Sequence, residues 1–110
     1  MAEKIKLVQG DTRPSIICTL TDSLTGEAIG LTGAVVRLYF KATGAEELTA
    51  TVIGSIVDAQ AGKVAFFPST APEMLQGEAG DYQGEIEITF DDGTKQTVYD
   101  LLKFKVREDF

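Results

Sequence analysis

Apolar and polar residues alternate with a period of two along most of this chain. The clearest segment is residues 82–90 (YQGEIEITF), in which every second residue is apolar or glycine and the residues between them are polar. Successive side chains of a β-strand point to opposite faces of a sheet, so this pattern predicts a strand that is buried on one face. The same reasoning predicts further strands near residues 4–8, 14–21, 34–41, 48–52, 56–58, 63–67 and 97–106.

Short turn sequences separate these segments. Residues 22–26 (DSLTG) and 91–94 (DDGT) combine short polar side chains with a glycine, which favours tight turns. Residues 69–77 carry one short helical pattern, for which we expect a Ser or Thr cap before Pro72 and an end at Gly77. The sequence therefore predicts a single immunoglobulin-like antiparallel β-sandwich over residues 1–110, with seven to eight strands and one short helical connector.

Composition excludes several functional classes. The 110 residues suit one domain. No apolar run is long enough for a membrane-spanning helix, and the first residues do not have the pattern of a signal peptide. One cysteine excludes an internal disulfide, and the lack of histidine removes the commonest general base and metal ligand. The formal net charge of −7 argues against a nucleic-acid or anionic-membrane surface. We expect a protein that is not an enzyme and needs no cofactor.

Two features concern the last hairpin. The alternation slips near residues 100–102, which predicts a bulge that shifts which side chains face the core. We also expect outward acids to face outward bases across the hairpin, with Glu85 and Glu87 on the first strand and Lys103, Lys105 and Arg107 on the second.

The segment that enters the strand at residue 82 predicts a tyrosine corner. In immunoglobulin-like sandwiches a tyrosine hydroxyl bonds back to nearby backbone at this crossover between the sheets. Gly80 and Tyr82 are the candidate residues. Gly84 stands two residues after the tyrosine where antibody domains have cysteine, so this is not an antibody-type domain.

The order of the turn motifs resembles one known family. Residues 26–36 (GEAIGLTGAVV) resemble a G-x-P-x-D-L-T-G-A-x-V pattern, and residues 56–64 (IVDAQAGKV) resemble I-x-D-A-x-x-G-x-V. With residues 80–82 (GDY), 90–93 (FDDG) and 106–109 (VRED), these motifs are similar to the phage baseplate upper protein N-terminal domain family. The chain departs from that pattern at Gly30 and at residues 99–100. The resemblance implies an immunoglobulin-like module of a tailed-phage virion.

Residues able to carry out chemistry have simpler structural explanations. Asp22, Asp81, Asp91 and Asp92 would have to converge to bind calcium, and turn chemistry accounts for the same residues. Glu85 and Glu87 lie side by side on one exposed face, which does not suit a glycosidase. Cys18 alternates with apolar residues and is best explained as a small buried side chain, so we expect no catalytic residues and no metal site.

Apolar residues on outward faces are the better candidates for function. Exposed aromatic side chains on sheets are typical anchors of protein interfaces, and open sheet edges favour strand addition. Burial by the fold is the alternative for each candidate. The candidate interface residues are Val35, Tyr39, Phe67, Tyr99, Leu101 and Phe110.

The family resemblance implies a function. The chain is expected to be a structural component of a virion assembled in the bacterial host cytoplasm, as a tail or baseplate adaptor or a fibre-attachment module. A capsid decoration protein is the first alternative, and a carbohydrate- or host-surface-binding module is the second. The expected partners are other virion proteins and further copies of the chain in a symmetric assembly, with no nucleic acid and no membrane.

Overall fold

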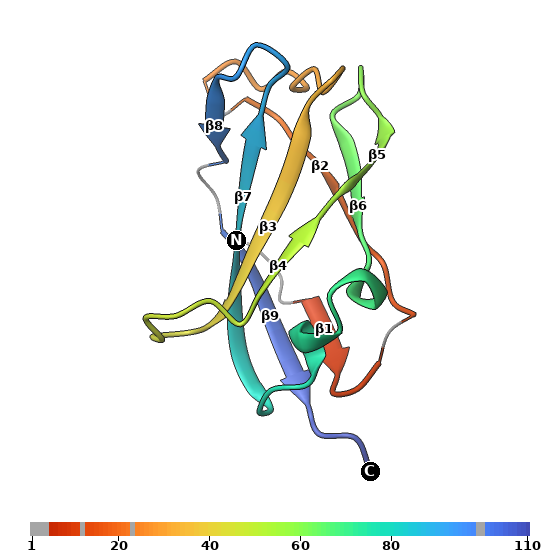
Figure 1. Cartoon of the computed structure of the whole chain (residues 1–110), viewed down its shortest axis with the longest axis vertical. Helices are drawn as coiled ribbons and strands as arrows, with labels where there is room; N and C mark the ends of the chain where they lie inside the picture. The colour runs from red at the N-terminus through yellow and green to blue at the C-terminus, as the bar shows by residue number, and fades with distance from the viewer. Residues whose placement is uncertain (1–4, 12, 23, 99–100) are drawn as a thin grey trace.

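The computed structural model describes residues 5–11, 13–22, 24–98 and 101–110 of the chain. These residues form nine strands and two 3₁₀ turns, η1 and η2 (Figure 1). None of their helical segments is long and apolar enough to cross a membrane. The elements in chain order are β1 (Ile5–Val8), β2 (Ile16–Thr19), β3 (Val35–Ala42), β4 (Ala50–Ile53), β5 (Ser55–Asp58), β6 (Lys63–Phe66), η1 (Pro68–Thr70), η2 (Pro72–Leu75), β7 (Gly80–Thr89), β8 (Lys95–Thr97) and β9 (Leu102–Arg107).

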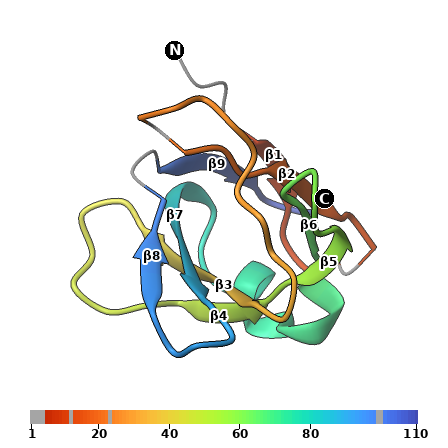
Figure 2. The same ribbon diagram turned by 90° about the horizontal axis from the view of Figure 1, so that it is seen from above.

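The strands form two sheets that enclose the core between them (Figure 2). The larger sheet has the order β1-β9-β7-β3-β4 with β8 also paired to β7, and the smaller sheet has the order β2-β6-β5. This arrangement is a β-sandwich, which confirms the predicted fold class. All pairs are antiparallel except β1 and β9, which run parallel. The wholly antiparallel expectation is wrong for this pair because β1 lies beside the last strand and not beside β2.

The last hairpin is interrupted between β8 and β9. Glu87 of β7 stands opposite Thr97, whereas Gly84 stands opposite Leu102. Three steps along β7 thus correspond to five along the returning chain, so the returning chain carries two extra residues. Residues 99–100 of the expected bulge lie outside the described residues. The break divides one predicted strand into β8 and β9, which is why nine strands are found where seven to eight were predicted.

The inserted residues do not change which side chains face the core. Side chains alternate with a period of two, so an even number of extra residues restores the same facing. Val98 packs against the core before the break, and Phe104 and Val106 are buried after it. The predicted irregularity is therefore present in the register, but the predicted switch of facing is wrong.

The core is built on the inward residues of the longest strands. Leu38 and Phe40 of β3 and Ile88 of β7 are fully buried, as the alternation predicts. The Phe40 ring stacks on Tyr82, with ring centroids 4.7 Å apart and planes 9° apart. It also meets Phe104 edge-on at 5.0 Å. These three rings join β3, β7 and β9 at the centre of the larger sheet.

The short connector between β6 and β7 consists of η1 and η2. Its first turn begins at Pro68, whose fixed φ suits the first helical position, and neither turn has a side-chain cap. The expected Ser or Thr cap is therefore wrong, and the Thr70 hydroxyl instead donates to the carbonyl of Phe67 at 2.8 Å. Met74 and Leu75 are buried, so the connector contributes apolar side chains to the core next to β4.

The charge pairing predicted for the last hairpin is wrong. Lys105 stands opposite Asp81, with Nζ 3.9 Å from Oδ1, and Lys103 stands opposite Gln83. Without the two extra residues the register of β8 would place Lys103 opposite Asp81; with them Lys103 stands opposite Gln83, which is still two residues short of Glu85. Glu85 and Glu87 instead stand opposite Tyr39 and Arg37 of β3, and Arg107 stands opposite Val8 of β1.

Candidate functional site

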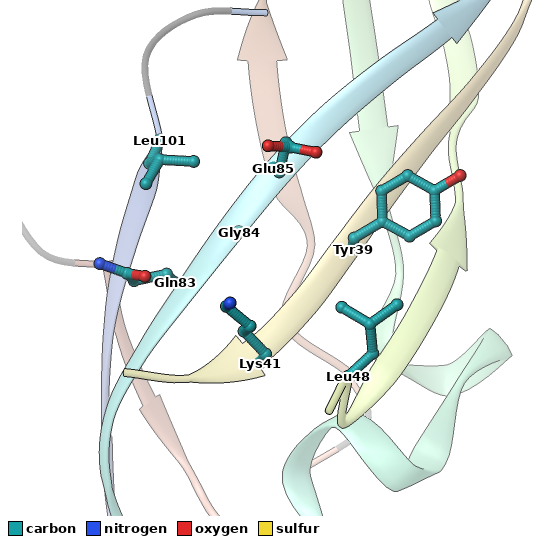
Figure 3. Close-up of a pocket in the computed structure, with 7 residues that line it drawn as sticks. All are labelled: Tyr39, Lys41, Leu48, Gln83, Gly84, Glu85 and Leu101. Atoms are coloured by element: carbon teal, nitrogen blue, oxygen red, sulfur yellow. The ribbon is translucent and has the colours of Figure 1, made fainter. Parts of the chain in front are cut away.

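A groove of about 390 Å³ lies on the outer face of the six-stranded sheet (Figure 3). Side chains from β3, β7, the loop before β4 and the segment before β9 surround it. This face is opposite the core, so the groove opens to solvent and its chemistry is available to a partner. Its lining residues are Tyr39, Lys41, Leu48, Gln83, Gly84, Glu85 and Leu101.

The floor of the groove is the backbone of β7 at Gly84. A Cβ at this position would point into the core, 2.7 Å from Cδ1 of Leu38 and 2.9 Å from Cε2 of Phe104. Core packing therefore requires glycine here. The break between β8 and β9 lies beside the same stretch of β7, and β-bulges of this kind often re-aim side chains next to functional sites. The groove thus depends on a local irregularity of the sheet.

Two leucines stand on opposite sides of the groove (Figure 3). Leu48 in the loop before β4 is 51% exposed, and Leu101 immediately before β9 is 38% exposed. Removing apolar side-chain surface from water is favourable by about 25 cal/mol for each Å², a gain that association costs partly offset in a complex. These leucines therefore give the groove its main potential for binding an apolar group.

Tyr39 forms part of one wall and is held by a hydrogen bond. Its hydroxyl donates to Oε1 of Glu87 at 3.0 Å. Desolvation raises the pKa of Tyr39, and the hydrogen bond and negative charge of Glu87 raise it further. The hydroxyl therefore stays protonated at neutral pH and keeps the ring in place beside the groove.

The remaining lining residues make a polar rim. Lys41 and Gln83 are half-buried and stand opposite each other on β3 and β7, while Glu85 is exposed. An apolar centre with a polar, hydrogen-bonding rim is the usual anatomy of a protein-docking surface. The groove is thus suited to hold an apolar side chain of a partner while its rim pairs with the partner's backbone or charges.

The structure brings together two of the six candidate interface residues. Tyr39 and Leu101 both line the groove. Val35 is exposed on the same face at the far end of β3, and Phe67 is exposed just after β6 of the other sheet. Phe110 is fully exposed, with its ring 5.0 Å from the guanidinium carbon of Arg107. Tyr99 lies outside the described residues.

Sequence reasoning did not single out Leu48, Lys41 or Gln83. The alternation predicts a strand at 48–52, but β4 begins at Ala50 and leaves Leu48 in the loop. Lys41 and Gln83 looked like ordinary solvent-facing strand residues. They line the same groove because Lys41 of β3 pairs with Gln83 of β7.

A second feature of the sequence, the tyrosine corner, is found at the beginning of β7. The Tyr82 hydroxyl donates to the carbonyl of Glu78 at 2.5 Å, four residues upstream, and the side chain is 6% exposed. This is the geometry of a tyrosine corner, and it fixes the crossover from the connector into β7. Gly80 lies between the two bonded residues with a φ of +145°, a conformation that L side chains rarely adopt.

Replacing Gly80 with valine is expected to lower the free energy of unfolding by more than about 1 kcal/mol. A Cβ at Gly80 would meet no atom within 4 Å, so the cost comes from the backbone conformation alone. Thermal melts or urea unfolding measure the change. The matched control is Gly30→Ala, since Gly30 also has open space but an ordinary φ. Equal stability of Gly80→Val and wild type would contradict this account.

Removing the hydroxyl in Tyr82→Phe is expected to cost about 1 kcal/mol at neutral pH. Burial raises the pKa of Tyr82, and the charge of Glu78 raises it further. As the pH rises, the unfolded chain therefore loses the Tyr82 hydroxyl proton before the folded protein does. The contribution of Tyr82 to the free energy of unfolding is complete below the ordinary pKa of about 10 and falls as the pH rises above it. Urea unfolding at neutral and alkaline pH should show a shallower alkaline decline in Tyr82→Phe. An unchanged decline would rule out this role for Tyr82.

The acidic residues considered for calcium lie far apart. Asp81 is near the beginning of the ten-residue β7 and Asp91 lies beyond its other end, so these acids do not converge as a calcium site would require. Asp22 and Asp92 each accept backbone hydrogen bonds within their own turns. The hydroxyl and backbone N–H of Thr94 hold the pKa of Asp92 below its usual value. Within the described ranges, no group of three or more Cys, Asp or Glu is arranged to hold a metal ion.

Cys18 lies on β2, away from the groove. It is half-buried and packs against the core, and desolvation raises the pKa of its thiol. A raised pKa keeps the sulfur protonated and weakly nucleophilic at neutral pH.

Comparison with known proteins assigns no role to any residue of this chain. Neither a protein family nor a curated protein matches it.

Proposed function

We propose that this protein is a non-enzymatic structural component of a tailed-phage virion, and that it docks onto neighbouring virion proteins through the outer face of its six-stranded sheet. The observation that carries the docking role is the pair of half-exposed leucines, Leu48 and Leu101, across a groove with a polar rim. The assignment to a virion rests on the order of turn motifs that resembles the phage baseplate module. A tail or baseplate adaptor is the first expectation within this class.

The direct test is to find the protein in particles. Tailed particles produced by the cell that encodes this chain are banded by density and analysed by mass spectrometry. The protein should band with the particles in a fixed ratio to the major structural proteins. Separation of heads from tails then distinguishes an adaptor, which stays with tails, from a decoration protein, which stays with heads. Absence of the protein from purified particles would overturn the proposal.

The oligomeric state tests how the module assembles. Light scattering over a concentration series gives the solution mass of the purified chain. A stable trimer or hexamer fits a part that carries its own assembly interface. A monomer at high concentration fits an adaptor whose order comes from a partner surface, with many weak copies gaining strength from the symmetry of that surface.

A carbohydrate-binding module is the second candidate, and one observation favours it. The ring of Tyr39 stands at the groove beside the amide of Gln83 and the carboxylate of Glu85, which are groups that sugars use for stacking and hydrogen bonding. Against it, the opposing walls are leucines, which offer a sugar hydroxyl nothing to bond. Specific binding on a glycan array that is lost in Tyr39→Ala would place this candidate first.

A further inference from the structure

Most of the basic residues of this acidic chain lie on one face. The sequence has ten Lys and Arg residues against seventeen Asp and Glu. Seven of the ten stand on the outer face of the six-stranded sheet; two of these, Arg37 and Lys95, are opposite Glu87 and Thr89 toward the end of β7. The other five are on β1, β3 and β9, and we name them the basic stripe: Lys6, Lys41, Lys103, Lys105 and Arg107.

The stripe is not arranged to stabilise the fold. Lys6 stands directly opposite Lys105 in the register of β1 and β9, and both side chains are exposed. Like charges facing each other across a strand pair are destabilising. Asp81 offsets part of this charge, with Oδ1 3.9 Å from Nζ of Lys105. A local arrangement that works against stability is typical of a functional surface.

The stripe is continuous with the groove. Lys41 lines the groove and stands opposite Gln83, which in turn stands opposite Lys103. Gln83 also lines a second hollow of about 170 Å³ on the same sheet, together with Lys103 and Thr43. Figure 3 shows Lys41 and Gln83 beside the leucine walls of the groove. The register then places Lys103 on the other side of Gln83, so apolar walls, an amide and basic side chains follow one another across this face.

We propose that the segment of a partner protein that docks on this face is an extended acidic peptide, which places an apolar side chain in the groove and its carboxylates on the basic stripe. This inference rests on the proposed function in one respect, that the partner is a protein. It adds the chemistry and conformation of the part that binds.

The spacing of the stripe fits a peptide strand. Lys103, Lys105 and Arg107 are alternate residues of β9, so they repeat about every 7 Å along the strand. Alternate side chains of an extended peptide repeat at the same distance, so successive carboxylates on one face of it match successive cations. β1 is the edge strand of this sheet, so its outer edge is also open to backbone pairing.

A nucleic acid fits this face less well. The chain as a whole carries a formal charge of −7, which repels a long polyanion that extends beyond the stripe. The leucine walls of the groove match an aliphatic or aromatic side chain of a peptide and offer no partner to a sugar–phosphate backbone.

The test is fluorescence anisotropy with the whole protein and a labelled peptide in which glutamate alternates with threonine around a central phenylalanine. Binding should weaken at least about tenfold in Lys103→Glu/Lys105→Glu. It should also weaken as salt rises to about 0.15 M, where charges are screened beyond about 8 Å. A peptide with glutamine for glutamate should not bind, and one with alanine for phenylalanine should bind more weakly.

The matched control is Lys63→Glu/Lys95→Glu. It changes the net charge by the same amount, but Lys63 is on the other sheet and Lys95 is at the far end of the larger one. This variant should bind within about twofold of wild type. Thermal melts test whether both variants are folded. If Lys103→Glu/Lys105→Glu is unfolded, Lys103→Gln/Lys105→Gln is used in its place.

Three results would each overturn the inference: no peptide binding at low salt, equal weakening in both double variants, or equally strong binding of oligothymidylate, which would indicate a general polyanion surface. Failure here is distinct from failure of the proposed function. A protein that is present in particles but does not bind the acidic peptide keeps its structural role and loses this docking mode.

Discussion

Replacing Gly62 with alanine is expected to lower the free energy of unfolding by about 3 kcal/mol or more. Gly62 lies in the turn between β5 and β6 with a φ of +69°, which alone strains an L side chain. A Cβ there would also stand 2.5 Å from the carbonyl oxygen of Leu20 and 3.0 Å from that of Ile29. These are backbone atoms, and Leu20 is tied to this turn by a 2.8 Å hydrogen bond from its N–H to the carbonyl of Gly62. The contact therefore cannot be relieved by a side-chain rotation.

Gly26→Ala separates the two causes. Gly26 has a similar φ of +73°, but a Cβ there would meet nothing within 4 Å. Its substitution should lower the free energy of unfolding by about 1 kcal/mol, which is the cost of the backbone conformation alone. Urea unfolding of both variants gives the difference, which measures the steric contact at Gly62. If the two variants lose equal stability, the segment around Leu20 yields and our description of a rigid contact there is incorrect.

Replacing Phe40 with alanine is expected to cost about 3–5 kcal/mol, the range for deleting a buried aromatic side chain. Phe40 is fully buried in the second half of β3 and contacts two other rings, stacked on Tyr82 and edge-on to Phe104. Its removal leaves a cavity between β3, β7 and β9 and breaks both ring pairs. For a domain of this size that loss is a large part of the total stability, and the variant is expected to be partly unfolded at 37 °C.

Phe67→Ala is the control for this substitution. It deletes the same side chain at an exposed position just after β6, so it should cost less than about 1 kcal/mol. Calorimetry or urea unfolding measures both. A small cost at Phe40 would mean that neighbouring side chains refill the space and that the three rings do not form a fixed cluster.

Core and groove lie on the two sides of the same strand. Phe40 points into the core, whereas its neighbours Tyr39 and Lys41 line the groove on the outer face. Because the strand alternates, a shift of β3 by one residue would exchange these roles. The ring cluster that holds Phe40 therefore also holds the groove residues in register with β7.

The candidate site was only partly predictable from sequence. Tyr39 and Leu101 were recognised as apolar residues on outward faces, and that much follows from alternation. Their common groove follows from the pairing of Tyr39 with Glu85 and from the two extra residues before Leu102. The slip in alternation near residues 100–102 signals the irregularity, but the pairing of Tyr39 with Glu85 has no local signature, since strand neighbours that are distant in sequence are chosen by the whole sheet.

Local sequence patterns were sufficient to predict the all-β class, the inward faces of the main strands, the turns at Gly26 and Gly93, and the candidate tyrosine at position 82. Each of these follows from interactions within a few residues: alternation, positive φ and short polar side chains. Long-range pairing sets the parallel arrangement of β1 and β9, the number of extra residues between β8 and β9, and the gathering of seven of the ten basic residues on one face. These depend on which distant strands pair and in what register, and that choice is made by burying the shared core.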